Sequence, residues 1–439
     1  MFAMAAVLQA GEMNAMWPAE KTGEREILGR KIIRFDHDCL KIWGAETGRE
    51  YFNVLLPTKK SAQPHPLLVF LHSAGGNADG SYDEVLAACN LLNMGGPEFV
   101  GLMPDSPSNG AGGWWGFNDM KADPAKYDRL NTPVEQRVLA TIEWVVRKYN
   151  VDRNRIYLAG ASMGGSGTLG IGMCHGDIFA AIWACCPAGS EHVMRRMRLA
   201  LPPKADAAPD VQKKYLNAVS GAGLPDAPPI LSFASPSDSW SSDLPQFLRA
   251  AHDGRHALVF AWGPWNHGYM AYLANPAAYQ FPWLKIRRNE AYPVFTDATS
   301  DREYPGSNPK SPDTEGQLNA FFRWKNVKDS PEEFAIELSL VGAADLNKEA
   351  PKPLREVMTP QPPPPPDLFA LLPERSTADV TLRRLQKFAL KTGFTYEWSF
   401  GQGNDAVSGT LKPDSAGLLT FKRLIIKNQP SRLTVKRKT

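Results

Sequence analysis

The chain has 439 residues, more than a single hydrophobic core supports, because single cores stop growing at roughly 250 to 300 residues. Hydrophobic residues make up 43% of the chain and charged residues 22%, as in soluble globular proteins, so a large core can be buried. The 49 basic and 46 acidic residues leave a net charge of +3, which gives no electrostatic reason to expect a nucleic-acid partner. We therefore expect one large domain and a smaller appended one.

The cysteines give no sign of a metal site. They are odd in number, and no two have the C-x-x-C spacing, which argues against a zinc site and against a dense disulfide framework. The five are Cys39, Cys89, Cys174, Cys185 and Cys186. We expect no bound metal and no cofactor.

No apolar run approaches the roughly 20 residues that cross a bilayer, so we expect no membrane partner. The opening stretch 1–10 is apolar but has no basic residue before it, so it resembles at best the trimmed end of a secretion signal. On that ground we favour a secreted or periplasmic location over the cytoplasm. The sequence does not set the oligomeric state.

Short apolar runs alternate with helical patterns between residues 50 and 262, which predicts strands of a mostly parallel sheet flanked by helices. Their near-continuous hydrophobicity is typical of strands covered on both faces. We place this α/β domain at 45–289, after an N-terminal extension at 1–44. The predicted strands are 51–56, 67–71, 99–103, 155–159, 180–186, 229–234 and 257–262.

One helix has a clear start. Thr132, Pro133 and Glu135 form a capping-box pattern with proline at the first helical position, and apolar residues then recur at helical spacing as far as Tyr149. We expect the helix to end near Asn150. The segment 152–155 is then predicted to turn the chain back into a strand.

Beyond about residue 290 the pattern changes to alternating and β-rich segments, such as 334–340 and 418–427. These predict a small β-sandwich at 290–439. It includes a Pro-rich segment at 360–366, which we interpret as a stiff loop or spacer rather than a ligand for a proline-recognising domain. Residues 201–228, rich in Pro and Ala between two strands, predict an excursion that partly covers the site.

A candidate nucleophile follows the predicted strand 155–159. Residues 160–164 fit the motif G-x-S-x-G with Ser162 at its centre, and residues from Gly165 onward can begin a helix. Glycines on both sides remove the Cβ atoms that would clash in a sharp strand-to-helix turn. The Ser162 hydroxyl is then expected at a helix N-terminus, where a developing oxyanion is favoured.

The same stretch contains a competing motif, because residues 165–170 spell G-x-G-x-x-G. That pattern binds dinucleotides when it directly follows a strand, whereas here it begins inside the predicted helix. We prefer the interpretation that small residues let this helix approach the sheet closely.

The chain order Ser, then Asp or Glu, then His is expected on such a sheet. Of eight histidines, only His267 follows the last predicted strand, in a loop able to bring its imidazole over the serine. Asp238 follows the strand that ends near Ala234, and would hold that imidazole in the tautomer that accepts the serine proton. Asp243 is the alternative acid, and capping a turn is the alternative role of Asp238.

Two backbone N–H groups would have to face the reaction centre to stabilise an oxyanion. One is expected from Met163, next to the nucleophile. The other is expected from the small-residue loop 72–76 after the strand 67–71, where Ala74 is the predicted donor and the His72 ring a hydrogen-bonded support.

These motifs resemble a family of enzymes. The segment 150–165, the H-x-A-G-G loop at 72–76 and the Asn-His-Gly at 266–268 are similar to those of secreted feruloyl esterases, acetyl xylan esterases and polyhydroxybutyrate depolymerases. The resemblance covers about residues 45 to 285 and implies the α/β-hydrolase fold and cofactor-free hydrolysis of an ester through an acyl-enzyme. Members of the group often have glycine directly after the loop histidine, where Ser73 stands here.

Aromatic residues surround the predicted site. Trp114 and Trp115 lie on a Gly-flanked loop after a strand end, and Trp240 and Trp265 flank the predicted acid and base. Large aromatic faces suit sugars or a phenolic acyl group, so we predict that these four bind substrate, with core packing as the alternative.

The sequence thus predicts a serine carboxylesterase acting on small-molecule or polysaccharide esters, such as acetyl or feruloyl groups of plant polysaccharides, or on a related polyester. A serine peptidase of the same fold and a non-catalytic carbohydrate-binding protein with a hydrolase-like core remain alternatives.

Overall fold

The computed structural model describes residues 19–27, 29–37, 50–59, 61–81, 98–106, 113–114, 131–188, 226–267, 275–348, 371–401, 403 and 406–438. Several predicted features lie outside the described residues: Trp115, the Pro-rich segment at 360–366 and all but the end of the excursion at 201–228.

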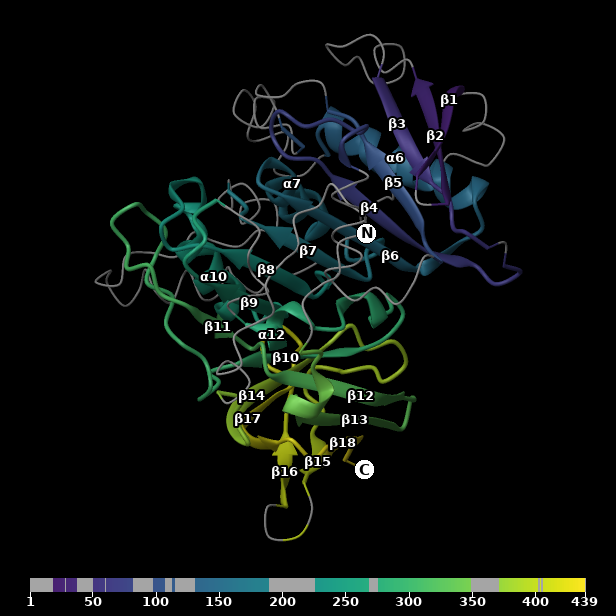
Figure 1. The fold of residues 1–439 in the computed structure, drawn as a ribbon. Helices are drawn as coiled ribbons and strands as arrows, with labels where there is room; N and C mark the ends of the chain where they lie inside the picture. The colour runs from purple at the N-terminus through teal and green to yellow at the C-terminus, as the bar shows by residue number, and fades with distance from the viewer. Residues whose placement is uncertain are drawn as a thin grey trace.

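A ten-stranded sheet forms the centre of the molecule (Figure 1), with the strand order β1-β2-β3-β5-β4-β6-β7-β8-β9-β11. Neighbouring strands from β5 to β9 pair in parallel, whereas β1, β2, β3 and β11 pair antiparallel to their neighbours. The strands are β1 (Glu20–Ile27), β2 (Arg30–His37), β3 (Glu50–Leu55), β4 (His65–Leu71), β5 (Val100–Pro104), β6 (Val151–Ala161), β7 (Ala181–Cys185), β8 (Ile230–Ala234), β9 (Leu258–Trp262) and β11 (Gly316–Leu318). The order from β2 to β9, with helices packed on the parallel strands, is that of the α/β-hydrolase fold.

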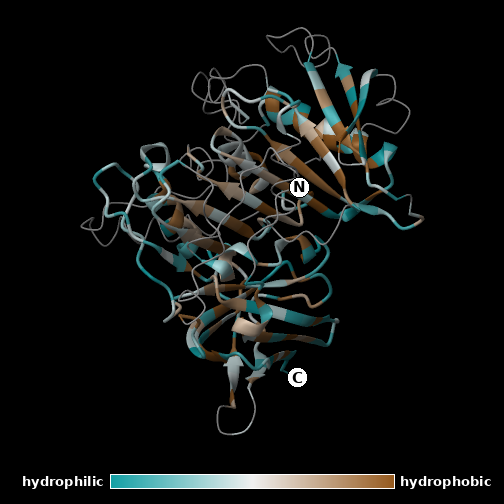
Figure 2. Cartoon of the chain, viewed as in Figure 1, coloured by the Kyte–Doolittle hydropathy of each residue, from teal (hydrophilic) through white to brown (hydrophobic). Residues whose placement is uncertain are grey.

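Every strand predicted between residues 50 and 262 is present. Most of the strand ends differ from the predicted ones by one to four residues. The cause of the agreement is burial on both faces: all residues of β5, β7, β8 and β9 are buried. Figure 2 shows the same strands largely in the hydrophobic colours.

Helix α6 (Pro133–Lys148) begins as predicted. The Thr132 hydroxyl accepts from the Glu135 N–H at 3.3 Å, and the Glu135 carboxylate accepts from the Thr132 N–H at 3.3 Å, so the capping box is complete. The predicted turn at 152–155 is wrong, because the chain reverses at Asn150, whose φ is +49°, and β6 already begins at Val151.

The other described helices are short. They are α7 (Met163–Gly172), α10 (Leu244–Asp253), α12 (Pro276–Tyr279) and the 3₁₀ turns η1 (Ser239–Ser241), η2 (Trp283–Lys285) and η3 (Ala343–Asp345). Among the described helices, none combines the length and the hydropathy needed to cross a membrane.

The C-terminal part consists of two further antiparallel sheets, below the large sheet in Figure 1. One contains β10 (Tyr292–Thr296), β14 (Arg375–Arg383) and β17 (Thr420–Lys427); the other contains β12 (Phe322–Asp329), β13 (Glu333–Leu340), β18 (Ser431–Arg437), β15 (Tyr396–Phe400) and β16 (Val407–Leu411). Val380 and Phe421 of the first sheet share one buried cluster with Ile336 and Leu433 of the second. The two sheets therefore face each other across a common core, as in a β-sandwich.

The large sheet extends past both limits of the predicted α/β domain. Strands β1 and β2 lie before residue 45, and β11 lies after residue 289 and pairs with β9. The C-terminal part also contacts the segments that lead into β8 and β7: Arg383 pairs with Asp226 at 2.9 Å, and Arg384 donates to the Ala180 carbonyl at 3.1 Å. The domain limits 1–44, 45–289 and 290–439 stay predictions.

Candidate active site

Ser162 occupies a sharp turn between a strand and a helix. Strand β6 ends at Ala161, α7 begins at Met163, and Ser162 between them has φ +53° and ψ −120°. Such a backbone conformation is strained for a residue with a side chain, and it places the hydroxyl above the end of the sheet. The Ser162 N–H donates to the Cys185 carbonyl at 2.9 Å, so strand β7 helps to hold the turn.

Glycine is required around this turn because backbone atoms crowd it. A Cβ atom on Gly160 would lie 2.4 Å from the Gly164 carbonyl oxygen, and one on Gly164 would lie 1.8 Å from the Leu71 carbonyl oxygen. One on Gly165 would lie 2.4 Å from the Cys185 carbonyl oxygen. The glycines predicted on both sides of the serine therefore let α7 begin directly against β4 and β7.

The competing G-x-G-x-x-G motif lies entirely within α7, and all ten residues of this helix are buried. A Cβ atom on Gly167 would lie 2.2 Å from the Trp114 Cβ, and one on Gly172 would lie 2.8 Å from the Ile182 Cγ2. The small residues thus allow close packing of the helix, and they do not form a phosphate-binding loop at a strand end.

The three residues predicted as nucleophile, base and acid lie in one hydrogen-bonded chain. The His267 Nε2 is 2.8 Å from the Ser162 Oγ, 105 residues away in sequence, and the His267 Nδ1 is 2.8 Å from the Asp238 Oδ2. The Asp238 carboxylate requires a donor, so Nδ1 carries the proton and Nε2 accepts from the serine hydroxyl. Asp238 is 3% exposed, whereas the His267 side chain is 40% exposed at the open end.

Asp238 has two roles at once. Its Oδ1 accepts from the Trp240 N–H at 3.0 Å, and its Oδ2 accepts from the Ser241 hydroxyl at 3.4 Å, so it also caps η1. These bonds fix the carboxylate that faces His267. Asp243, the alternative acid, stands instead at the N-terminus of α10.

Two groups that hold the histidine loop were not predicted from the sequence. The Ser235 hydroxyl accepts from the Asn266 N–H at 3.1 Å, one residue before the base. The Tyr304 hydroxyl, from beyond β10, donates to the Ser235 carbonyl at 3.4 Å. No local sequence signal marks either contact, because the partners are 31 and 69 residues apart.

The loop after β4 is built as a support. The Ser106 N–H donates to the His72 Nε2 at 3.0 Å, so the ring donates from Nδ1 to the Ser73 carbonyl at 2.9 Å. Burial lowers the pKa of His72, which keeps the ring neutral in this role. The Ser73 hydroxyl donates to the Ala161 carbonyl at 3.1 Å and so joins the loop to the end of β6.

Ala74 in this loop is exposed and Met163 is buried. Their assignment as oxyanion donors stays a prediction.

The predicted substrate-binding tryptophans differ in exposure. Trp114 is fully buried and donates its indole N–H to the His72 carbonyl at 2.9 Å, so it packs under the loop and offers no face to a substrate. Trp240 is 43% exposed, and its ring centroid lies 6.2 Å from that of His267. Trp265 is half-buried against the apolar cluster on one face of the sheet. Only Trp240, among the three that are described, combines exposure with contact to the candidate base.

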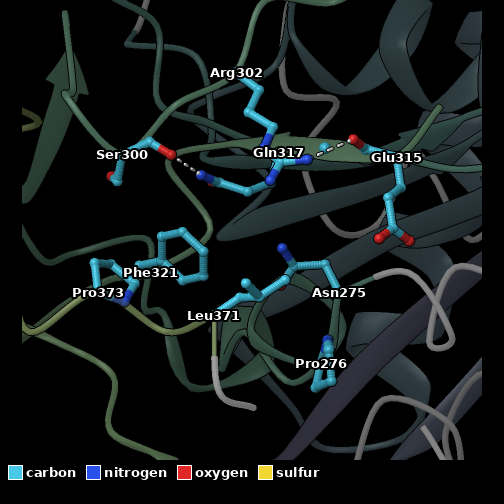
Figure 3. Close-up of a pocket in the computed structure, with 10 residues that line it drawn as sticks. Asn275, Pro276, Ser300, Arg302, Glu315, Gln317, Phe321, Leu371 and Pro373 are labelled. Atoms are coloured by element: carbon cyan, nitrogen blue, oxygen red, sulfur yellow. Dashed lines mark hydrogen bonds between the residues drawn. The ribbon is translucent and has the colours of Figure 1, made fainter. Parts of the chain in front are cut away.

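A separate pocket of 210 Å³ lies between β11 and the C-terminal part (Figure 3). Two pairs of its lining residues are hydrogen-bonded: Gln317 donates to the Ser300 carbonyl at 2.7 Å and Arg302 to the Glu315 carbonyl at 3.3 Å. None of its lining residues is one of the three in the hydrogen-bonded chain.

Comparison with known proteins finds partial similarity to esterases. No family model matches the chain. Over 162 residues it is 26% identical to feruloyl esterase B of Neurospora crassa, a match that covers 36% of this chain and 52% of that protein. The chain thus spans about half the length of this curated relative.

Solved structures that are similar in part include an S-formylglutathione hydrolase from Staphylococcus aureus, with 16% identity and a TM-score of 0.37, covering 56% of this chain and 92% of that one. An acetyl xylan esterase from Aspergillus awamori has 15% identity and a TM-score of 0.32, covering 46% and 73%. The fold itself follows from the strand order and from the turn at Ser162. The chain has the α/β-hydrolase fold and resembles the esterases of that type.

Proposed function

We propose that the protein is a serine carboxylesterase in which Ser162 is the nucleophile, His267 the general base and Asp238 the residue that orients the imidazole. The observation that carries this proposal is the continuous hydrogen-bonded chain from Ser162 through His267 to the buried Asp238, with 2.8 Å at each step. This is the geometry that nucleophilic catalysis by a hydroxyl requires.

The reaction would proceed in two halves. The Ser162 Oγ attacks the ester carbonyl while the His267 Nε2 takes the hydroxyl proton, and Asp238 stabilises the imidazolium that results. The imidazolium then gives this proton to the departing alcohol, which leaves an acyl group on Ser162. A water molecule, deprotonated by His267, cleaves that acyl-enzyme and restores the hydroxyl. Each step uses groups of this chain and water, and the proposal includes no cofactor.

The oxyanion that forms in both halves would be stabilised by the Ala74 and Met163 amides. The N-terminus of α7, which begins directly after Ser162, adds a favourable dipole. The bond from Ser73 to Ala161 supports this assignment, because it holds the loop that contains Ala74 against the strand that ends at the nucleophile.

The substrate class that we propose is an acetyl or feruloyl ester of a plant polysaccharide, or a related polyester. The exposed Trp240 ring beside His267 supports a phenolic or sugar group, because aromatic faces stack on both. A relative named feruloyl esterase B supports the same class.

A substrate panel tests the proposal. The purified chain and its Ser162→Ala variant are assayed on p-nitrophenyl acetate, methyl ferulate, acetyl xylan, polyhydroxybutyrate and an aminoacyl anilide. We expect hydrolysis of the esters by the wild type and none above background by the variant. Equal hydrolysis by both proteins would refute the role of Ser162, and faster cleavage of the anilide than of every ester would favour a peptidase.

A further inference from the structure

A thiol lies directly against the proposed acid and base. Cys186 follows β7, has a φ of +45°, and is 3% exposed. One potential ligand atom each from Cys186, Asp238 and His267 lies within 4.8 Å of the other two. The three residues come from the C-terminal ends of three neighbouring parallel strands, β7, β8 and β9, which brings a sulfur, an oxygen and a nitrogen together.

This donor set has a defined preference among cations. A cysteine sulfur, an imidazole nitrogen and a carboxylate oxygen are the common ligands of Zn²⁺ and of the softer Cd²⁺, whereas Mg²⁺ takes oxygen ligands. Zinc bonds of roughly 2.0 to 2.3 Å set tetrahedral ligand atoms about 3.5 Å apart. From the observed limit of 4.8 Å, the ligand atoms would have to approach one another by at most about 1.3 Å.

We propose that Cys186, Asp238 and His267 form an inhibitory binding site for a thiophilic divalent cation such as Zn²⁺. The inhibitory consequence rests on the proposed function, whereas the binding itself does not. The nitrogen that would bind the cation is Nδ1, because it is the one that faces Asp238, at 2.8 Å.

The protons account for the inhibition. In the resting tautomer the Nδ1 proton lies toward Asp238 and Nε2 accepts from Ser162. When the cation takes the Nδ1 lone pair, the single ring proton must reside on Nε2, and the Cys186 thiol releases its proton to solvent. An Nε2–H donates a hydrogen bond and cannot remove the hydroxyl proton. Cation binding and activation of the nucleophile therefore exclude each other.

The neighbouring cysteine supplies a matched control. The Cys185 Sγ lies 3.8 Å from the Cys186 Sγ, and Cys185 is equally buried at 1% exposure, yet it is not in the three-ligand group. Each change to alanine removes one sulfur atom from a buried position, and only in Cys186→Ala does the lost thiol belong to the three-ligand group.

The test uses the full chain with Cd²⁺ as the probe, because a cadmium–thiolate bond absorbs in the ultraviolet. Wild type, Cys185→Ala, Cys186→Ala and Cys186→Ser are titrated, and each is also assayed on p-nitrophenyl acetate relative to its own metal-free rate. Mg²⁺ is the control cation, and a chelator tests reversal.

We expect wild type and Cys185→Ala to bind one Cd²⁺, to show the ultraviolet cadmium–thiolate absorption band, and to lose esterase activity reversibly. Both Cys186 variants should lose the band and need at least about tenfold more cation for half inhibition. An unchanged band and unchanged inhibition in the Cys186 variants would overturn the proposal, as would a wild type without the band. Ser162→Ala separates the cation site from the esterase function, since this variant should retain the band without hydrolysing ester. If the wild type shows the band but hydrolyses no ester, the cation site stands and the esterase function is refuted.

Discussion

Replacing Asp238 by asparagine tests the orientation of the base most sharply. The carboxylate accepts from the His267 Nδ1 at 2.8 Å, from the Trp240 N–H at 3.0 Å and from the Ser241 hydroxyl at 3.4 Å. An asparagine keeps the shape, and its carbonyl oxygen can keep the Trp240 bond, which leaves the amide NH₂ to face Nδ1. Nδ1 must then accept, so the proton moves to Nε2 and the ring can no longer take the proton of Ser162.

The size of the effect follows from this wrong tautomer. The same change in a serine triad lowers kcat about 10⁴-fold, which corresponds to about 5 kcal/mol of transition-state stabilisation. Asp238 is 3% exposed, so bulk water has little access to replace the carboxylate. We expect a loss of this order here, with KM for the ester changed little.

Steady-state hydrolysis of p-nitrophenyl acetate measures the loss, and Asp243→Asn is the matched control. Asp243 stands at the start of the next helix, so its variant should retain most of the rate. An Asp238→Asn variant within tenfold of the wild type, or a greater loss in Asp243→Asn, would refute the assignment of the acid.

Three further predictions concern packing, substrate and pH. The Cβ of Gly164→Ala would lie 1.8 Å from the Leu71 carbonyl oxygen, so this variant should lower the free energy of unfolding, measured in urea, by about 3 kcal/mol or more. In the control Gly23→Ala the nearest atom is 3.5 Å away, so the free energy of unfolding should change by less than about 0.5 kcal/mol. Equal effects of the two variants would contradict the close packing at Gly164. Trp240→Ala should lower kcat/KM for methyl ferulate about three- to tenfold more than for p-nitrophenyl acetate, because a stacking face is lost, and an unchanged ratio would remove Trp240 from the substrate site. Burial raises the pKa of Asp301 from 3.8 to about 7. Between these pH values the folded state holds a proton that the unfolded state has lost, so the free energy of unfolding should fall as the pH rises from about 4 to about 7. Asp301→Asn, which can still accept from the Asn319 N–H, should flatten that fall in urea unfolding at several pH values, and a persistent slope would assign it to other groups.

The features that the sequence predicted correctly are specified by local patterns or by chain order. The glycines that pack closely against β4 and β7 indicate the β6–α7 turn, and Thr132 and Glu135 indicate the capping box of α6. Chain order alone then selected His267, because it is the one histidine after the last parallel strand.

The features that were missed depend on distant partners or on weak patterns. Strand β1 is almost wholly exposed and rich in charge, so its sequence carries no apolar signal and it stays in place by pairing with β2. Sequence spacing could not decide between substrate binding and core packing for Trp114, because its packing against Gly167 joins positions 53 residues apart. The position of Cys186 beside Asp238 depends in the same way on the parallel pairing of β7 with β8.

Covalent labelling shows whether Ser162 is an activated nucleophile. The purified chain is treated with a fluorophosphonate, and the modified peptide is identified by mass spectrometry in wild type, His267→Ala and Ser162→Ala. We predict a single phosphonate on Ser162 in the wild type, much slower labelling in His267→Ala because the base is lost, and none at this peptide in Ser162→Ala. Equal labelling rates in wild type and His267→Ala, or modification of another serine in place of Ser162, would contradict the account.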